Sequence, residues 1–167
     1  MTDRIDPPFS ADERTMLDTW LDYHRATLEL KCEGLTDDQL RERSVPPSKM
    51  SLLGLVRHMA EVERNWFRRV LLGEEAPPRF YSKERPDDDF DDLESDTVAD
   101  TLAFWRDECE YARKAAAAKE LDDLAAARRH GDDVTLRWIL VHMIEEYARH
   151  NGHADFLRER IDGATGD

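Results

Sequence analysis

Along four segments of the chain, apolar residues recur every three or four positions, a spacing that places them on one face of an amphipathic helix. The first of these faces consists of Leu17, Leu21, His24 and Leu28. Ser10 and Glu13 fit a capping box, in which two polar residues satisfy free backbone N–H groups at a helix start. Gly34 ends this first predicted helix.

The second predicted helix runs from about Leu52 to Leu72, with Ser51 as its candidate N-cap and Gly73 as its end. The preceding stretch SVPPSKMS contains two consecutive prolines and is typical of a loop. The inward positions of the second helix are Leu52, Leu55, Met59, Val62, Trp66 and Val70.

The third and fourth predicted helices follow a long connection. The third begins near Asp96 or Thr97 and extends to about Lys119, and the fourth begins at Asp133 or Thr135 and ends at Gly163. The third apolar face alternates between spacings of four and three, as in a bundle seam: Val98, Leu102, Trp105, Cys109 and Ala112. The fourth face consists of Leu136, Leu140, Met143, Tyr147, His150, Ala154 and Leu157.

The connection over residues 74–94 contains three prolines and the acidic run DDDFDD, so we expect a charged loop without regular structure beyond a turn. The acidic run lacks the spacing of a calcium loop, which favours a solvated face. Four amphipathic helices with one long crossover connection predict an all-α four-helix bundle, with residues 1–167 as a single domain.

Composition narrows the classes of function. The formal net charge of −14 disfavours binding to nucleic acid or to an anionic membrane surface. No apolar run approaches the roughly 18 residues of a membrane helix, and residues 1–16 lack the apolar core of a secretory signal. Cys32 and Cys109 form neither a disulfide framework nor a CxxC motif. We therefore expect a cytoplasmic protein with reduced thiols.

Histidines and glutamates cluster in the predicted helices. His142, Glu146 and His150 are spaced by four residues, so their side chains share one helix face with Cβ atoms about 5–6 Å apart. Glu146 and His150 are able to hold one metal ion from consecutive turns, with His58 as a third ligand from the facing helix. An ordinary core histidine and an exposed pair are the alternatives, and spacing alone leaves them open. Burial of an unpaired Glu146 carboxylate would cost several kcal/mol, which a cation offsets.

The segments SLLGLVRHMAEVERNWF and LRWILVHMIEEYARHNGHADFLRERIDG resemble the DinB-like superfamily, and more closely its actinobacterial branch of mini-circle-type and mycothiol-dependent proteins. The resemblance covers nearly the whole chain. In that superfamily a histidine of the second helix and an H/E-x3-H pair of the fourth bind one divalent metal, and a glycine follows two residues after the pair. His150-Asn151-Gly152 matches that place, so the resemblance implies the ligands His58, Glu146 and His150.

Glutamate at position 146 departs from the commonest pattern of the superfamily, which has histidine there. A His-Glu-His set also occurs in the related mycothiol-dependent maleylpyruvate isomerases, so the departure does not abolish the site. His142 and His153 remain alternative ligands. Two imidazoles and one carboxylate suit Zn²⁺, with Ni²⁺, Fe²⁺ or Mn²⁺ as alternatives, and three protein ligands leave a coordination position open.

The resemblance further implies a low-molecular-weight thiol cosubstrate (mycothiol or bacillithiol) that the metal holds as thiolate. The sequence therefore predicts a metal-dependent thiol S-transferase, or a thiol-assisted isomerase, acting on a small electrophile. His24 is a candidate proton acceptor or a residue that orients a ligand, and an ordinary core histidine is the alternative.

Two other functions stay open at this point: a metal-dependent hydrolase, and a non-enzymatic bundle that a metal only stabilises. The resemblance also implies a homodimer, for which Trp20, Trp66 or Phe67 could form an exposed patch.

Overall fold

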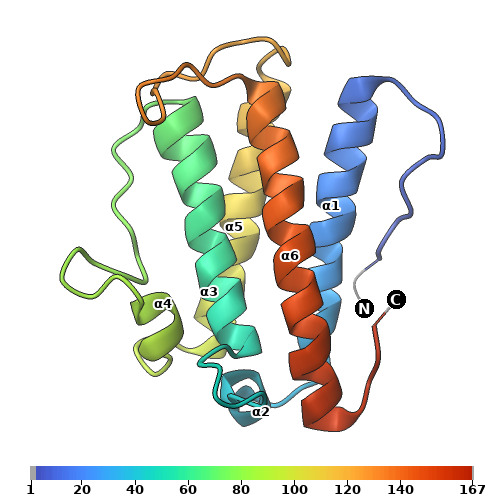
Figure 1. Ribbon diagram of the computed structural model, residues 1–167, viewed down its shortest axis with the longest axis vertical. Helices are drawn as coiled ribbons and strands as arrows, with labels where there is room; N and C mark the ends of the chain where they lie inside the picture. The colour runs from blue at the N-terminus through green and yellow to red at the C-terminus, as the bar shows by residue number, and fades with distance from the viewer. Residues whose placement is uncertain (1–2, 167) are drawn as a thin grey trace.

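The computed structural model describes residues 3–166, and the regular structure in that range is helical, with only two isolated β-bridges. Four long helical segments form a bundle (Figure 1): α1 (Glu13–Cys32), α3 (Leu52–Glu63) with its continuation η1 (Arg64–Leu71), α5 (Val98–Ala117) and α6 (Leu136–Asp162). Two short helices, α2 (Asp37–Arg41) and α4 (Asp88–Asp91), lie in the connections. The predicted all-α four-helix bundle is confirmed.

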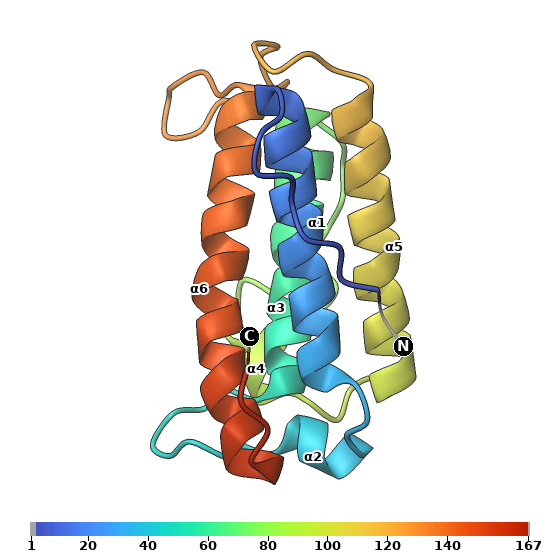
Figure 2. The same ribbon diagram turned by 90° about the vertical axis from the view of Figure 1, so that its right-hand side faces the viewer.

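The long connection determines how the four long helices are arranged in space. Helix α1 packs along α6 and α3 packs along α5, while α3 also faces α6 (Figures 1 and 2). Helices α3 and α5 run in the same direction, so residues 72–97 must return along the outside of the bundle from one end to the other. This is the crossover connection that the sequence predicted.

Polar side chains and one glycine set the helix boundaries. Ser51, Thr97 and Thr135 each accept a hydrogen bond from a backbone N–H of the first turn, and Gly163 ends α6 at φ +80°. These boundaries match the predicted ones. At α1 the predicted capping box of Ser10 is wrong: the helix begins at Glu13, and the Asp12 carboxylate accepts from the Thr15 N–H at 3.0 Å.

The second predicted helix is continuous, but its last two turns are π-helical. In this geometry N–H groups bond five residues back, which changes the angular position of successive side chains. Both Trp66 and Phe67 are therefore buried, with 5% and 1% of their surfaces exposed. The expectation that they form an exposed patch is wrong, and only Trp20 of the three aromatics is exposed, at 40%.

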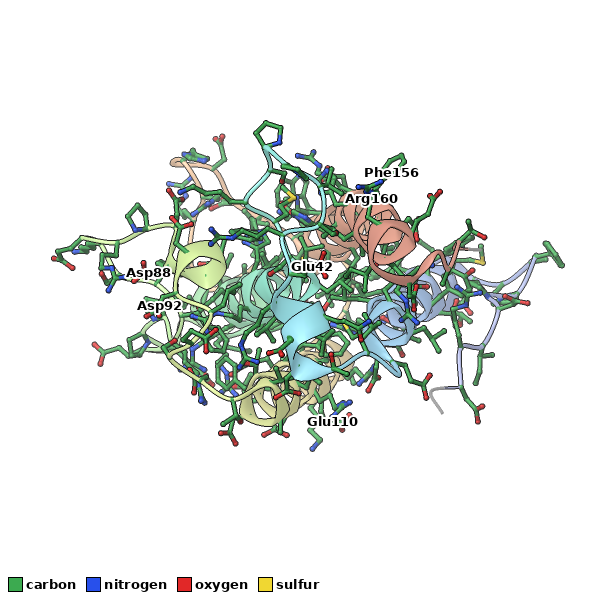
Figure 3. All side chains as sticks on the ribbon, turned by 90° about the horizontal axis from the view of Figure 1, so that it is seen from below. Glu42, Asp88, Asp92, Glu110, Phe156 and Arg160 are labelled. Carbon is green, nitrogen blue, oxygen red and sulfur yellow. The ribbon has the colours of Figure 1, made fainter. Side chains whose placement is uncertain are left out.

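The long connection is more ordered than its charge suggested. Arg57 of α3 donates to the Asp88 carbonyl at 3.1 Å and to the Ser95 hydroxyl at 3.2 Å. Glu61, one turn further along, accepts from two backbone N–H groups of the connection, those of Arg79 and Phe80. Helix α4 is thereby held against the bundle, with Asp88 and Asp92 labelled at its outer side in Figure 3.

The sequence analysis predicted that the acidic run DDDFDD is a solvated face. This prediction is wrong for one of its residues. Asp89 is buried, with 6% of its surface exposed, because α4 turns this carboxylate toward α3. The charge of the run does not indicate that Asp89 is buried, because the burial of one carboxylate depends on a partner from a distant segment.

A buried polar network joins the four long helices. The Arg25 guanidinium on α1 donates to both Glu63 oxygens at 2.8 Å, and the Tyr147 hydroxyl on α6 donates to Glu63 Oε1 at 2.8 Å. That hydroxyl accepts from Trp105 Nε1 on α5 at 2.9 Å. The Cys109 thiol lies 3.6 Å from the same carboxylate. The carboxylate is fully buried and has a partner on each of the other three long helices.

Charge pairing governs the protonation of this network. Burial disfavours the charged guanidinium, but the Glu63 carboxylate, together with Cys109 and Tyr147, outweighs burial and raises the pKa of Arg25. Burial also raises the pKa of the Tyr147 hydroxyl and that of the Cys109 thiol, so both stay protonated and able to donate. No helix within the described range is long and apolar enough to cross a membrane.

Tyr147→Phe is expected to lower the free energy of unfolding by about 1–3 kcal/mol, because it leaves the buried Trp105 N–H without an acceptor. Urea denaturation followed by circular dichroism measures the change. The matched control is Tyr111→Phe, whose hydroxyl donates to the exposed Glu74 and whose loss should cost no more than about 0.5 kcal/mol. Equal stability of the two variants would contradict a structural role for the network.

Candidate metal centre

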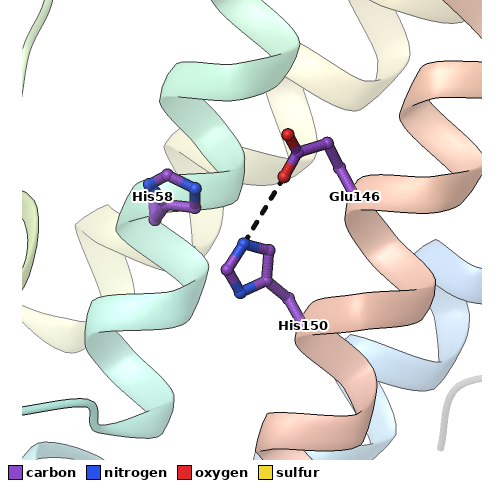
Figure 4. A group of neighbouring side chains, drawn as sticks. All are labelled: His58, Glu146 and His150. Atoms are coloured by element: carbon purple, nitrogen blue, oxygen red, sulfur yellow. Dashed lines mark ion pairs between the residues drawn. The ribbon is translucent and has the colours of Figure 1, made fainter.

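His58, Glu146 and His150 come together between α3 and α6. Each offers one ligand atom, and these atoms lie within 4.8 Å of one another. Glu146 and His150 project from consecutive turns of α6, and His58 faces them from α3 (Figure 4). The arrangement agrees with the set that the sequence resemblance implied. That these three residues hold a divalent metal stays a prediction.

Asp89 orients His58. Its Oδ2 lies 2.9 Å from His58 Nδ1, and the neighbouring Phe90 ring packs against the imidazole with a centroid distance of 5.3 Å. A carboxylate at Nδ1 keeps a proton on that nitrogen and leaves the lone pair of Nε2 free for a metal. Sequence reasoning missed this residue. The one available signal was the apolar Phe90 within the acidic run, which indicates that part of the run faces the interior.

His150 is held as a neutral imidazole. Burial, together with the nearby basic groups of His58, His153 and Arg149, lowers its pKa to about 4. Its Nε2 lies 3.5 Å from Glu146 Oε2, and its Nδ1 lies 3.3 Å from His153 Nδ1. If Nε2 is the metal ligand, Nδ1 carries the proton and donates a hydrogen bond to His153 Nδ1. His153 therefore fits the role of a partner that orients a ligand.

The donor set fits a divalent metal ion. Two histidines with orienting partners and one carboxylate form an open three-ligand set of the kind found in catalytic zinc sites. The same donors also accommodate nickel, iron or manganese. The bundle supplies the ligands from rigid helices, so their separation does not depend on a loop.

A second group shares Glu146. His142, Glu145 and Glu146 also bring ligand atoms within 4.8 Å of one another, with His142 Nε2 at 3.4 Å from Glu146 Oε1. All three residues lie on one helix, and Glu145 is half exposed and paired with Arg149. The first group is the better metal site, because its histidines come from two helices and each has an orienting partner.

His24 does not join either group. The Asn151 amide donates to the His24 carbonyl at 3.0 Å and lies 3.4 Å from its Nδ1, and the ring packs beside Trp20 and Tyr23. Burial lowers the pKa of His24. Its place in the contact between α1 and α6 agrees with the alternative interpretation, an ordinary core histidine. His24 does not line the cavity described next.

A cavity of about 760 Å³ opens beside the candidate metal ligands. Helices α3 and α6 form two of its walls, and the long connection and residues 129–134 contribute the rest. His58, Asp89 and Glu146 line one end, and Trp66 and Trp138 line the other. His142 lines the middle of the α6 wall, between Trp138 and Glu146. A small molecule in this cavity would have access to the open side of the ligand set.

Comparison with known proteins gives a family and a fold. The family model described as mycothiol S-transferase matches residues 16–163. No curated protein is significantly similar to the chain. A conserved protein from Enterococcus faecalis has a similar structure, with a TM-score of 0.66 and 12% sequence identity over 93% of this chain and 100% of that one. At this identity the similarity shows the fold alone.

Protein purified without a metal-binding tag and incubated with Zn²⁺ is expected to hold about one ion per chain, the capacity of a single three-ligand site. His58→Ala, Glu146→Ala and His150→Ala should each lose it, because two protein ligands bind zinc far more weakly than three. Mass spectrometry of bound metals measures the content, and circular dichroism checks the helicity. The control is His130→Ala, which belongs to neither ligand group. Loss of metal in His142→Ala but not in His58→Ala would identify the second group as the site instead.

Asp89→Asn is expected to weaken zinc affinity by about 10- to 100-fold, the usual effect of removing a carboxylate that orients a histidine ligand. Competition with a chromogenic chelator measures the dissociation constant. Asp87→Asn, an exposed change in the same acidic run, is the matched control and should leave the affinity unchanged. Equal affinities of the two variants would show that Asp89 has no part in the site.

Proposed function

Because the chain belongs to the mycothiol S-transferase family, we propose that it is a metal-dependent enzyme that joins the thiol of mycothiol to a small electrophile. The observation that supports this most directly is the convergence of His58, Glu146 and His150, the first two of which line one end of a cavity large enough for a small molecule. A closed structural site would have no such access. A thiol-assisted isomerisation uses the same site and is the alternative within the family chemistry.

Each residue around the site has a separate role in the proposal. A divalent metal held there supplies the positive charge that lowers the pKa of a thiol. His58 is fixed by Asp89, and His150 is kept neutral by burial and by its neighbours, so both present lone pairs at neutral pH. Glu146 contributes a carboxylate whose second oxygen contacts His142.

His142 is the proposed proton acceptor. It lines the cavity, and its Nε2 lies 3.4 Å from Glu146, whereas His24 is not brought to the cavity. The S–H proton of mycothiol passes to this imidazole. The sulfur electron pair then forms a C–S bond with the electrophile, and the leaving group departs with the electrons of the bond that breaks. If the electrophile is an alkene, the proton returns to the adduct.

The proposal also bears on location and assembly. A free thiol cosubstrate requires a reducing compartment, which agrees with the expectation of a cytoplasmic protein. A homodimer stays part of the proposal, and Trp20 is the one residue of the expected patch that is exposed.

Zinc-loaded protein is expected to accelerate the reaction of mycothiol with 1-chloro-2,4-dinitrobenzene. A chelator should abolish the activity, and added zinc should restore it. His142→Ala should retain the metal but lose about 100-fold in kcat, because it removes the proton acceptor. Absorbance of the thioether measures the rate, and Phe156→Leu, a change at an exposed position of α6 outside the cavity, serves as the control.

Two outcomes would refute this assignment. Metal-loaded protein that leaves mycothiol unreacted but hydrolyses ester or amide substrates would identify a metal-dependent hydrolase. The protein could instead bind metal and gain stability from it, but show neither thiol transfer nor hydrolysis with a panel of electrophiles. That result would identify a bundle that the metal only stabilises.

A further inference from the structure

The cavity has two chemically different ends. The first is lined by the candidate ligands His58 and Glu146 and by Asp89, which orients His58. The second end, called here the distal end, is formed by Trp66 and Trp138. Glu146 and Trp138 lie eight residues apart on α6, which separates the two ends by about 12 Å along the helix axis. A ligand that reaches both ends must therefore be elongated.

The distal end presents one open aromatic surface. Trp66 is almost fully buried, and the Arg129 guanidinium lies over its ring at 5.5 Å. Trp138 packs against Trp66 with a centroid distance of 5.1 Å and stacks on His142 at 5.0 Å, yet 49% of its surface is exposed. Its neighbours hold the Trp138 ring in place, and it lines the cavity. Such a surface suits a ligand with a flat or ring-shaped apolar face.

The polar part of the cavity wall selects against anions. Its ionisable groups include five carboxylates but only one guanidinium, that of Arg129. Even a divalent metal at the first end would leave an excess of negative charge, which repels an anionic ligand. Carboxylates accept hydrogen bonds from hydroxyl groups, so the same wall favours a neutral, hydroxyl-rich ligand.

Glu61 is one of the five carboxylates of this wall. One of its oxygens holds the backbone of the long connection, while Oε2 is buried and has no hydrogen bond within residues 3–166. Its neighbouring cation, Arg69, is 3.7 Å away. Glu61 therefore contributes to the negative charge of the wall through its buried carboxylate.

We propose that the distal end is a subsite for the polyol rings of mycothiol, with Trp138 as the stacking platform. This inference rests on the proposed function, which places the sulfur at the metal end. Mycothiol carries its cysteine on an amino sugar that is linked to inositol, and apart from the thiol it has no ionisable group. Its rings offer C–H faces for the indole and hydroxyl groups for the carboxylates, and its length suits a cavity with two separated ends. An anionic thiol such as glutathione fits the charge of this wall poorly.

The test separates ring recognition from chemistry by the use of S-methyl mycothiol, whose sulfur has no proton to lose. Isothermal titration with metal-free protein measures its binding to wild type, Trp138→Leu, Trp138→Phe and Phe156→Leu, the last an exposed position of α6 outside the cavity. We expect Trp138→Leu to weaken binding by about tenfold. Trp138→Phe should restore part of the affinity, since it keeps an aromatic face, and Phe156→Leu should bind as wild type does. Circular dichroism establishes that all four proteins are folded.

Steady-state kinetics with zinc-loaded protein gives the second measurement. Trp138→Leu should raise the KM for mycothiol by about tenfold and change kcat less, and wild type should prefer mycothiol to glutathione. Unchanged binding and KM in Trp138→Leu would overturn the subsite while the transferase function stands. Equal use of glutathione would also overturn it. Failure of wild type to transfer any thiol, with S-methyl mycothiol still bound through Trp138, would refute the proposed function and retain the subsite.

Discussion

The buried carboxylate of Glu63 is the interaction on which the arrangement of the helices depends. It lies on α3 and binds Arg25 of α1 and Tyr147 of α6, which in turn accepts from Trp105 of α5. A buried charge without partners would be strongly destabilising, so the fold is stable only if these helices meet at this level.

The contact between Glu63 and Tyr147 also sets the register of α3 against α6. His58 lies five residues before Glu63 and His150 three residues after Tyr147, which in antiparallel helices places both on the same side of the contact, about 7.5 and 4.5 Å along the axes. The fold and the candidate metal centre therefore share one determinant.

Helix α3 connects this core to the cavity. Four polar side chains of this helix point in different directions. Glu63 points into the bundle, and His58 points toward α6. Arg57 and Glu61 point toward the long connection. The connection that Arg57 and Glu61 hold in place returns Asp89 to His58. A segment with the sequence of a solvated acidic loop thus forms part of the candidate site, because Arg57 and Glu61, on the same helix as the candidate ligand His58, also anchor this loop.

The charges of the cavity and of the two cysteines bear on the proposed thiol chemistry. The imidazole of His150 is neutral and its pKa is about 4, since burial and nearby basic groups disfavour its protonation. The carboxylates around the cavity leave it negative before a metal is bound, which favours a divalent cation at one end and a neutral ligand along the rest. The two buried cysteines take no part, as burial raises the pKa of Cys32 to about 12 and that of Cys109 further. A reactive sulfur would have to come from a cosubstrate.

The sequence by itself determined the four long helices, most of their caps and the crossover, because apolar periodicity, capping residues and proline-rich connections are local properties of the chain. All seven positions of the predicted apolar face of α6 are buried. The candidate ligands His58, Glu146 and His150 followed from spacing together with the family resemblance. Only the tertiary structure decided the burial of Asp89, the partners of Glu63, the π-helical turns that bury both Trp66 and Phe67, and the separation of His24 from the cavity. Each of these depends on contacts between residues far apart in the chain, and a charged side chain is buried or exposed according to partners that no local pattern specifies.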